Sequence, residues 1–212
     1  MKALLINPNS DLKVTEDLKN IVDRYETKYV DLDVIGTVNT PKLIITKEDI
    51  EDTYDELAKI IKEQEDTYDI FIIACHLDPN LKELRKITEK IVLGICEVSV
   101  LFAKMLGKSF SIIGASKDTV NMKHELVKSY GADDSLDRVS YIEKTKDSLK
   151  DNLYDAADKI EFNNKSDSII LGCAGFSHLD GYLEKSLQRD VIDGVALSIL
   201  LSDTYARYKE LK

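Results

Sequence analysis

The sequence predicts an α/β protein with parallel sheets, and two observations carry this prediction. The first is a regular alternation of short apolar runs with amphipathic stretches, which is the pattern of strands and helices in such folds. The second is that two of the apolar runs resemble each other. Residues 69–77 and 167–175 each begin with an aspartate, continue through apolar, mostly β-branched residues and reach a cysteine. Such runs are typical of strands buried on both faces of a parallel sheet.

The first half of the chain supplies four predicted strands, over residues 2–7, 29–35, 69–77 and 91–95. Apolar residues at helical spacing predict helices over residues 14–25, 47–64, about 80–88 and 96–106. Between them, residues 37–45 contain Pro41 and form a loop long enough to lie near a site.

The second half repeats this order. Its predicted strands cover residues 109–113, 138–142, 167–175 and 191–192. Its predicted helices cover residues 117–130, 144–162, about 178–187 and 194–209. Gly131 follows the first of these helices, as is common at helix ends. The last helix is expected to pack on the first half, because the second half already has its helices.

Matching strand ends recur at nearly one spacing. Cys173 follows Cys75 by 98 positions, Ser116 follows Ser10 by 106, and residues 191–195 match residues 91–95 at an offset of 100. The spacing indicates an internal duplication, and chance similarity between short apolar strands is the alternative. We therefore expect two similar subdomains, residues 1–97 with 194–212 and residues 98–193. A pseudo-twofold axis would relate them, with the active site in the cleft between them.

Composition excludes several classes of function. The net charge is −10, whereas nucleic acids and anionic membranes require a basic face. Apolar runs stay far below the roughly 18 residues of a membrane span, so we expect a cytoplasmic protein. The three cysteines have no CxxC spacing and do not suggest a disulfide framework. The three histidines, His76, His124 and His178, show no ligand spacing with them, so no metal is expected.

The two strand-end cysteines are the candidates for catalysis. Parallel strands point their carboxyl ends at the ligand crevice, and backbone N–H groups converge where a helix follows. In such surroundings the pKa of a cysteine thiol can approach neutrality. If Cys75 and Cys173 lie on opposite faces of one substrate carbon, one can remove its proton while the other adds a proton from the far side, which inverts the configuration of that carbon. Their sulfur atoms would then be roughly 6–8 Å apart in a closed site. The alternative is two buried core cysteines. Cys96 has no counterpart in the second half and is expected to be structural.

Other polar residues surround this pair in the sequence. His76 and His178 could each polarise a thiol or contact substrate, or be partly exposed loop histidines. Asn9, Ser10 and Ser116 follow strands on the cleft side, where they could hold a carbonyl or carboxylate or make ordinary turns. Asp193 is expected to cap the last helix, and the alternative is that it reaches the cleft.

Five motifs stand in a characteristic order: Ile6-Asn7-Pro8-Asn9-Ser10, Ala74-Cys75 followed by Asp78-Pro79, Gly94-Ile95 with Glu97, Leu171-Gly172-Cys173-Ala174-Gly175, and Val191-Ile192-Asp193-Gly194-Val195. Over nearly its whole length the chain thus resembles the aspartate/glutamate/hydantoin racemase superfamily, especially its hydantoin and allantoin racemase branch. The resemblance implies a cofactor-independent two-thiol racemase made of two flavodoxin-like halves, usually oligomeric. It assigns catalysis to Cys75 and Cys173, and substrate contacts to Asn9, Ser10, Ala174 and Gly175.

We therefore expect a racemase that inverts a carbon acid beside a carbonyl, with a 5-substituted hydantoin or allantoin as the small-molecule substrate. A homo-oligomer is expected. The alternatives are an aspartate or glutamate racemase, a related decarboxylase or isomerase, and a ligand-binding protein that has lost turnover. His76-Leu77 stands where hydantoin racemases have Phe-Gly, which leaves open a changed substrate or a loss of activity.

Overall fold

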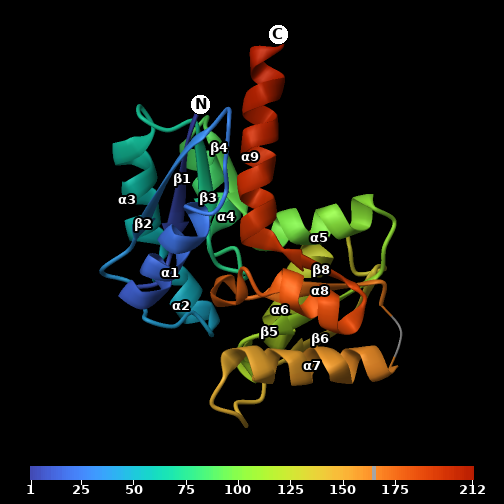
Figure 1. Ribbon diagram of the computed structural model, residues 1–212. Coiled ribbons are helices and arrows are strands. Elements are labelled where there is room, and N and C mark those ends of the chain that lie inside the picture. The colour runs from blue at the N-terminus through green and yellow to red at the C-terminus, as the bar shows by residue number, and fades with distance from the viewer. Residues whose placement is uncertain (164–165) are drawn as a thin grey trace. The chain divides into compact units, whose positions relative to one another are not determined.

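The computed structural model describes residues 1–163 and 166–212, which form two compact units, each with α/β structure (Figure 1). The first unit contains Met1–Ile95 and Val195–Lys212, and the second contains Cys96–Gly194. Each unit has a four-stranded sheet whose neighbouring strands are all parallel. The predicted α/β fold with parallel sheets is therefore confirmed.

The sheet of the first unit has the strand order β2-β1-β3-β4. Its strands are β1 (Lys2–Asn7), β2 (Asp31–Gly36), β3 (Ile70–Ile73) and β4 (Ile91–Gly94). Its helices are α1 (Leu12–Val22), α2 (Lys47–Glu51), α3 (Tyr54–Gln64), α4 (Leu81–Ile87) and α9 (Gly194–Glu210). As predicted, the last helix packs on this unit: Asp203 Oδ1 accepts hydrogen bonds from the backbone N–H groups of Lys28, Tyr29 and Val30.

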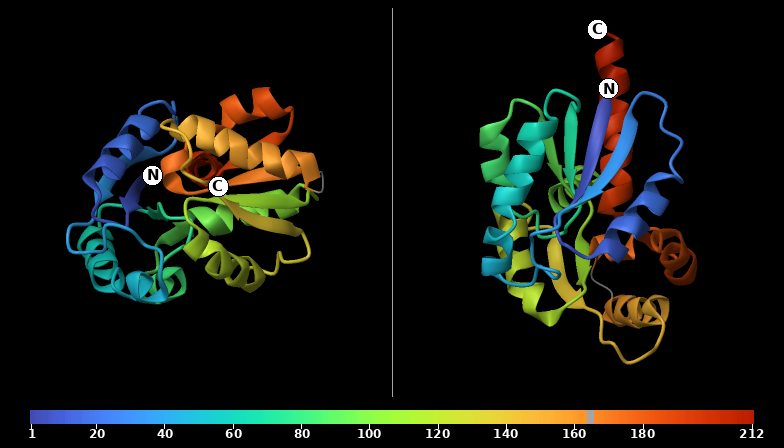
Figure 2. Two further views of the ribbon diagram at one scale, coloured as in Figure 1. Left: turned by 90° about the horizontal axis from the view of Figure 1, so that it is seen from below. Right: turned by 90° about the vertical axis from the view of Figure 1, so that its left-hand side faces the viewer.

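The sheet of the second unit has the equivalent order β6-β5-β7-β8. Its strands are β5 (Phe110–Gly114), β6 (Leu136–Tyr141), β7 (Ser168–Gly172) and β8 (Asp190–Asp193). Its helices are α5 (Ile95–Met105), α6 (Val120–Ser129), α7 (Leu149–Asn163) and α8 (Asp180–Leu187). Figure 2 shows α7 and α8 on one side of this sheet and α6 on the other. Every residue of β3 and β7 is buried, as their apolar sequences predict.

The helix predicted over residues 47–64 is interrupted, so that part of the prediction is wrong. Two helices, α2 and α3, are separated by Asp52 and Thr53. The Ile50 carbonyl accepts hydrogen bonds from Thr53 Oγ1 at 2.8 Å and from Asn80 Nδ2 at 2.6 Å. A side chain from a distant turn thus engages a carbonyl of the last turn of α2, which local apolar periodicity cannot reveal.

The helix predicted from residue 144 begins instead at Leu149. Asn152 reaches back over the preceding turn: its Oδ1 accepts from the N–H groups of Thr145 and Lys146 at 3.0 and 2.9 Å. Its Nδ2 donates to the carbonyls of Lys146 and Ser148. These four bonds satisfy the backbone in a non-helical conformation, and they delay the helix start.

The register of the two sheets supports the duplication. In the first sheet Ile73 pairs with Ile6 and Gly94, and in the second Leu171 pairs with Ile113 and Asp193. The equivalent strands are therefore offset by 107, 98 and 99 positions. The first and last values correct the predicted offsets of 106 and 100. Cys75 and Cys173 each follow the central residue of their triplet by two positions, so they are equivalent in the repeat.

Candidate active site

Cys75 lies two residues beyond β3, in a tight turn that leads toward α4. The Ala74 N–H donates to the Ile6 carbonyl at 2.9 Å, which extends the β1–β3 pairing to the residue before the cysteine. The Cys75 carbonyl in turn accepts from the N–H of Asp78 at 2.9 Å, and Asp78 has a φ of 42°. The side chain of Cys75 is partly exposed. This turn presents the thiol at the carboxyl edge of the first sheet.

The residues that follow Cys75 are buried. His76 is 2% exposed, so it is not a partly exposed loop histidine, and its contact with substrate stays a prediction. Asp78 is 4% exposed and packs against the end of β4. A Cβ atom at Gly94 would lie only 2.4 Å from Asp78 Cγ. The close approach of this carboxyl group therefore requires glycine at position 94.

Asn9 and Ser10 lie in the turn after β1, on the same edge of the first sheet. Asn7 organises this turn: it is fully buried, and its Nδ2 donates to Asn9 Oδ1 at 3.1 Å and to Thr15 Oγ1 at 3.0 Å. Asn9 Oδ1 also accepts from the Asp11 N–H at 3.0 Å, at the start of α1. Sequence reasoning missed Asn7 as the residue that positions Asn9, although both belong to one motif.

Cys173 occupies the equivalent place after β7, where Ala174–Phe176 form a 3-10 turn. Its side chain is partly buried and packs against the core of the second unit. Burial raises the pKa of the Cys173 thiol, while the backbone N–H of Gly175 and the positive charge of Lys123 act to lower it. A Cβ atom at Gly175 would lie 3.7 Å from Cys173 Sγ. Ala174 and Gly175 thus adjoin the sulfur.

Asp193 holds the loop behind Cys173. Its Oδ1 accepts from Ser177 Oγ and its Oδ2 from the N–H of His178, both at 3.0 Å. Asp193 and Ser177 are buried, whereas His178 is exposed at a φ of 69°. Of the alternatives for His178, the structure shows a loop histidine, and the helix predicted from about residue 178 begins at Asp180. The role of Asp193 in this loop was missed, because its partners lie about 15 residues earlier in the chain.

A buried carboxylate lies beside each of the two cysteine turns, but it comes from the turn in one unit and from the neighbouring strand in the other. In the first unit the buried carboxylate comes from the turn, as Asp78, and the strand end is Gly94. In the second unit the strand end is Asp193 and the turn supplies Ser177. Gly94 and Asp193 occupy equivalent register positions. A buried carboxylate thus lies beside each cysteine turn, contributed by opposite partners.

Ser116 and Cys96 have local roles. Ser116 Oγ accepts from the N–H of Asp118 at 3.2 Å and donates to Asp118 Oδ2 at 3.0 Å, which caps a short 3-10 helix. This is ordinary turn chemistry, and contact between Ser116 and substrate stays a prediction. Cys96 is fully buried in α5, as expected for a structural residue. Within the described residues, the three cysteines form no disulfide.

Lys123 is a second residue that sequence reasoning missed. It lies on α6, is 2% exposed, and its Nζ donates to the carbonyl of Gly172 at 2.9 Å. Gly172 directly precedes Cys173. Thr119, Lys123 and Val127 are all buried and follow one another at intervals of four. The sequence did contain a signal for this residue, because a lysine at an apolar position of a helix is unusual and marks a candidate functional side chain.

Each unit gathers its own set of the predicted residues at the carboxyl edge of its sheet. The first unit holds Asn9, Ser10, Cys75 and His76, and the second holds Ser116, Cys173, Ala174 and Gly175. Across the described part of the chain, no cluster of three or more metal-ligating side chains occurs. Likewise, none of the helices in that part is long and apolar enough to cross a lipid bilayer.

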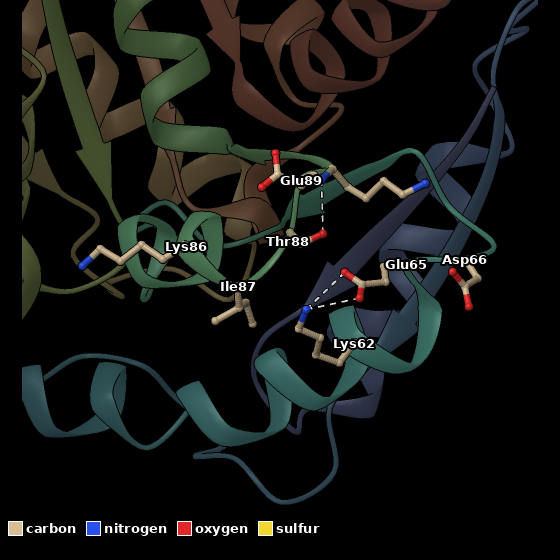
Figure 3. Close-up of a pocket in the computed structure, with 8 residues that line it drawn as sticks. Lys62, Glu65, Asp66, Lys86, Ile87, Thr88 and Glu89 are labelled. Atoms are coloured by element: carbon tan, nitrogen blue, oxygen red, sulfur yellow. Dashed lines mark hydrogen bonds and ion pairs between the residues drawn. The ribbon is translucent and has the colours of Figure 1, made fainter.

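A separate hollow lies at the opposite edge of the first sheet (Figure 3). It is bounded by the last turns of α3 and α4 and by the turn before β4; its lining residues are Lys62, Glu65, Asp66, Lys86, Ile87, Thr88, Glu89 and Lys90. Lys62 Nζ donates to Glu65 Oε1 at 3.2 Å. The hollow lies where β4 begins, whereas Cys75 follows the end of β3. It is therefore distinct from the cysteine site.

Comparison with known proteins agrees with this fold. Residues 4–201 match the family model described as Asp/Glu/Hydantoin racemase. The hydantoin racemase of Pseudomonas sp. (strain NS671) is 33% identical over 224 residues, covering 96% of this chain and 85% of that protein. The hydantoin racemase of Rhizobium meliloti is 27% identical, covering 96% and 88%. The solved allantoin racemase from Klebsiella pneumoniae has the same fold, with a TM-score of 0.91 at 21% identity and coverage of 99% and 89%.

Proposed function

The chain belongs to the Asp/Glu/hydantoin racemase family and is therefore an isomerase, and from this premise we propose that Cys75 and Cys173 are its catalytic acid and base. One observation supports this pair above all others. Each cysteine lies two positions beyond an equivalent register residue, Ile73 on β3 or Leu171 on β7.

In the proposed reaction one cysteine thiolate removes a proton from a carbon beside a carbonyl, and the opposite thiol donates a proton to the other face. The negative charge passes to the carbonyl oxygen, where backbone N–H donors stabilise it. We propose that the substrate is contacted by Asn9, Ser10, His76, Ser116, Ala174 and Gly175. No cofactor takes part, because the protons exchanged are carried by the two thiols.

The proposed substrate is a 5-substituted hydantoin or allantoin. The hydantoin ring spreads the charge that forms when the C5 proton leaves, and no neighbouring carboxylate adds a second negative charge. The similarity to hydantoin racemases supports this choice over an acidic amino acid, which is the second candidate. We further propose that the enzyme works in the cytoplasm, and that it is a homo-oligomer, as the family resemblance suggests.

Proton NMR in D2O tests the proposal without a prior choice of product. The protein is incubated with hydantoins, allantoin, aspartate and glutamate, and loss of the ring or α-proton signal is followed. We expect exchange with a hydantoin or allantoin, and a fall of at least about 10³-fold for Cys75→Ser and for Cys173→Ser. Cys96→Ser is the matched control and should retain activity.

Each other outcome has a defined meaning. Normal exchange in both serine variants would refute the two-thiol mechanism. Activity that survives the loss of one cysteine would favour the single-thiol chemistry of a related decarboxylase or isomerase. Tight binding of a ligand without any exchange would indicate a binding protein, and the His76-Leu77 segment would then be the first place to look.

A further inference from the structure

The ammonium group of Lys123 is fixed beside the backbone of Cys173. Its Nζ lies 2.9 Å from the carbonyl oxygen of Gly172, the residue that precedes the cysteine. Its stem passes Gly114 at the end of β5, where an added Cβ would lie 3.1 Å from Lys123 Cε. The side chain is 2% exposed, so the charge is held in one place with little access to solvent.

A lysine is costly at such a position. Lysine is among the residues least often found fully buried, because the ammonium group loses its hydration. An apolar side chain of similar volume would fill the same space without that cost. The burial of a charged group here therefore points to a role for the charge itself.

The space beside the end of the first strand of each unit, β1 or β5, is filled by different side chains in the two units. Asn7 and Gly114 are equivalent, since each follows a central-strand residue that pairs with β3 or β7. In the first unit the Asn7 side chain occupies the space and donates to Thr15 Oγ1. In the second unit glycine has no side chain, and the stem of Lys123 passes there instead. A neutral amide in one half is thus exchanged for a cation in the other.

We propose that Lys123 is a positioning residue that acts through Cys173, by fixing the Gly172 carbonyl and stabilising the thiolate form of the cysteine. The proposal rests on the proposed function, in which Cys173 must carry a negative charge in one half of each catalytic cycle. It does not require Lys123 to touch the substrate. Lys123 thereby keeps a larger fraction of Cys173 in the thiolate form, which is the form that accepts a proton, than burial alone would allow.

The electrostatics of the second unit agree with this role. Burial raises the pKa of the Cys173 thiol, and the charge of Lys123 opposes that increase. Other titratable groups around the cysteine loop are Asp193 on β8, His178 in the loop itself, Tyr182 on α8 and Tyr154 on α7. The carboxylate of Asp193 would oppose a thiolate, and it accepts bonds from the loop. Lys123 is the group whose charge favours the thiolate.

The test measures the Cys173 thiolate directly and needs no turnover. In a Cys75→Ser, Cys96→Ser background, Cys173 is the single remaining cysteine. Its rate of alkylation by iodoacetamide is followed by mass spectrometry from pH 6 to 10, because only the thiolate reacts. We expect Lys123→Met to move the profile to higher pH and to slow alkylation at pH 7 roughly tenfold.

Two further variants separate charge from structure. Lys123→Arg keeps the positive charge and should restore most of the alkylation rate at pH 7. Lys128→Met removes the same charge from an exposed position of the same helix and should leave the profile unchanged. Should Lys123→Met fail to fold, Lys123→Gln replaces it, since it also removes the charge and keeps a side-chain N–H group that can donate to the Gly172 carbonyl. That variant should move the profile in the same direction.

A folded Lys123→Met protein with an unchanged profile would overturn the proposal, and so would an unchanged profile in Lys123→Gln. Failure of the proposed function looks different. In that case the parent protein shows no cysteine-dependent deuterium exchange, whatever the alkylation profile does. A shifted profile together with Cys173-dependent exchange supports both.

Discussion

Gly94→Ala places a methyl group in space that the Asp78 carboxyl group already fills. The new Cβ would lie 2.4, 2.5 and 2.6 Å from Asp78 Cγ, Oδ1 and Oδ2. Carbon contacts are optimal near 3.5–4.0 Å, so the whole carboxyl group must move by roughly 1 Å. Asp78 cannot easily yield, because its backbone is in the left-handed region and its N–H is bonded to the Cys75 carbonyl. Overpacking of this kind typically costs about 1–3 kcal/mol.

The cost should appear in thermal unfolding and in turnover together. For a chain of this size, a loss of about 2 kcal/mol lowers Tm by roughly 4–8 °C. The displaced Asp78 turn carries Cys75, so the deuterium-exchange rate should fall as well. Gly181→Ala in α8 is the matched control: no atom lies within 4 Å of the added Cβ, and Tm should hold or rise slightly.

A double-mutant cycle identifies the cause. Asp78→Gly removes the carboxyl group and suits the positive φ, so Gly94→Ala should cost little in that background. An equal cost of Gly94→Ala with and without Asp78 would refute the reasoning, because the strain would then arise elsewhere.

Two more predictions concern the second unit. Asp193→Asn leaves one acceptor oxygen for two donors, Ser177 Oγ and the His178 N–H. It should lower the free energy of unfolding, measured by urea titration, by about 1.5–3 kcal/mol. The control is Asp190→Asn at the exposed start of β8, which should change that free energy by less than about 1 kcal/mol. Because the pKa of Cys173 is raised in the folded state, the stability that this thiol contributes is present below its unfolded pKa and is lost as pH rises through its folded pKa. Unfolding free energies measured above about pH 8.5 should therefore fall more steeply for the parent than for Cys173→Ser, and parallel curves would contradict the assigned burial.

The sequence was most informative where local pattern decides structure. Short β-branched runs predicted β3 and β7, because a strand buried on both faces needs apolar residues without alternation. It was least informative where a distant side chain decides. Asn80 donates to the Ile50 carbonyl in the last turn of α2, and Asp193 accepts from Ser177 in the loop after Cys173. Such contacts depend on which residues the fold brings together, and no periodicity encodes them.

The candidate site follows the same division. The strand-end positions of Cys75 and Cys173 could be inferred from spacing, because parallel strands end at one edge of a sheet. The burial of His76 and Lys123 could not, since a histidine beside a cysteine or a lysine on a helix is usually exposed. Polar residues on otherwise apolar faces were the one available signal.

The duplication gives these departures a meaning. The two units place their cysteines at equivalent positions, but the polar residues around each cysteine differ. Asn7 in the first unit corresponds to Gly114 with Lys123 in the second, and Gly94 corresponds to Asp193. In the proposed two-thiol mechanism each cycle begins with one thiolate and one thiol, and two identical environments would give neither cysteine a preference for either form. Different polar surroundings at the two equivalent positions would set which cysteine is the thiolate before substrate binds. The charge of Lys123 beside Cys173 is the part of this difference that a single substitution can remove.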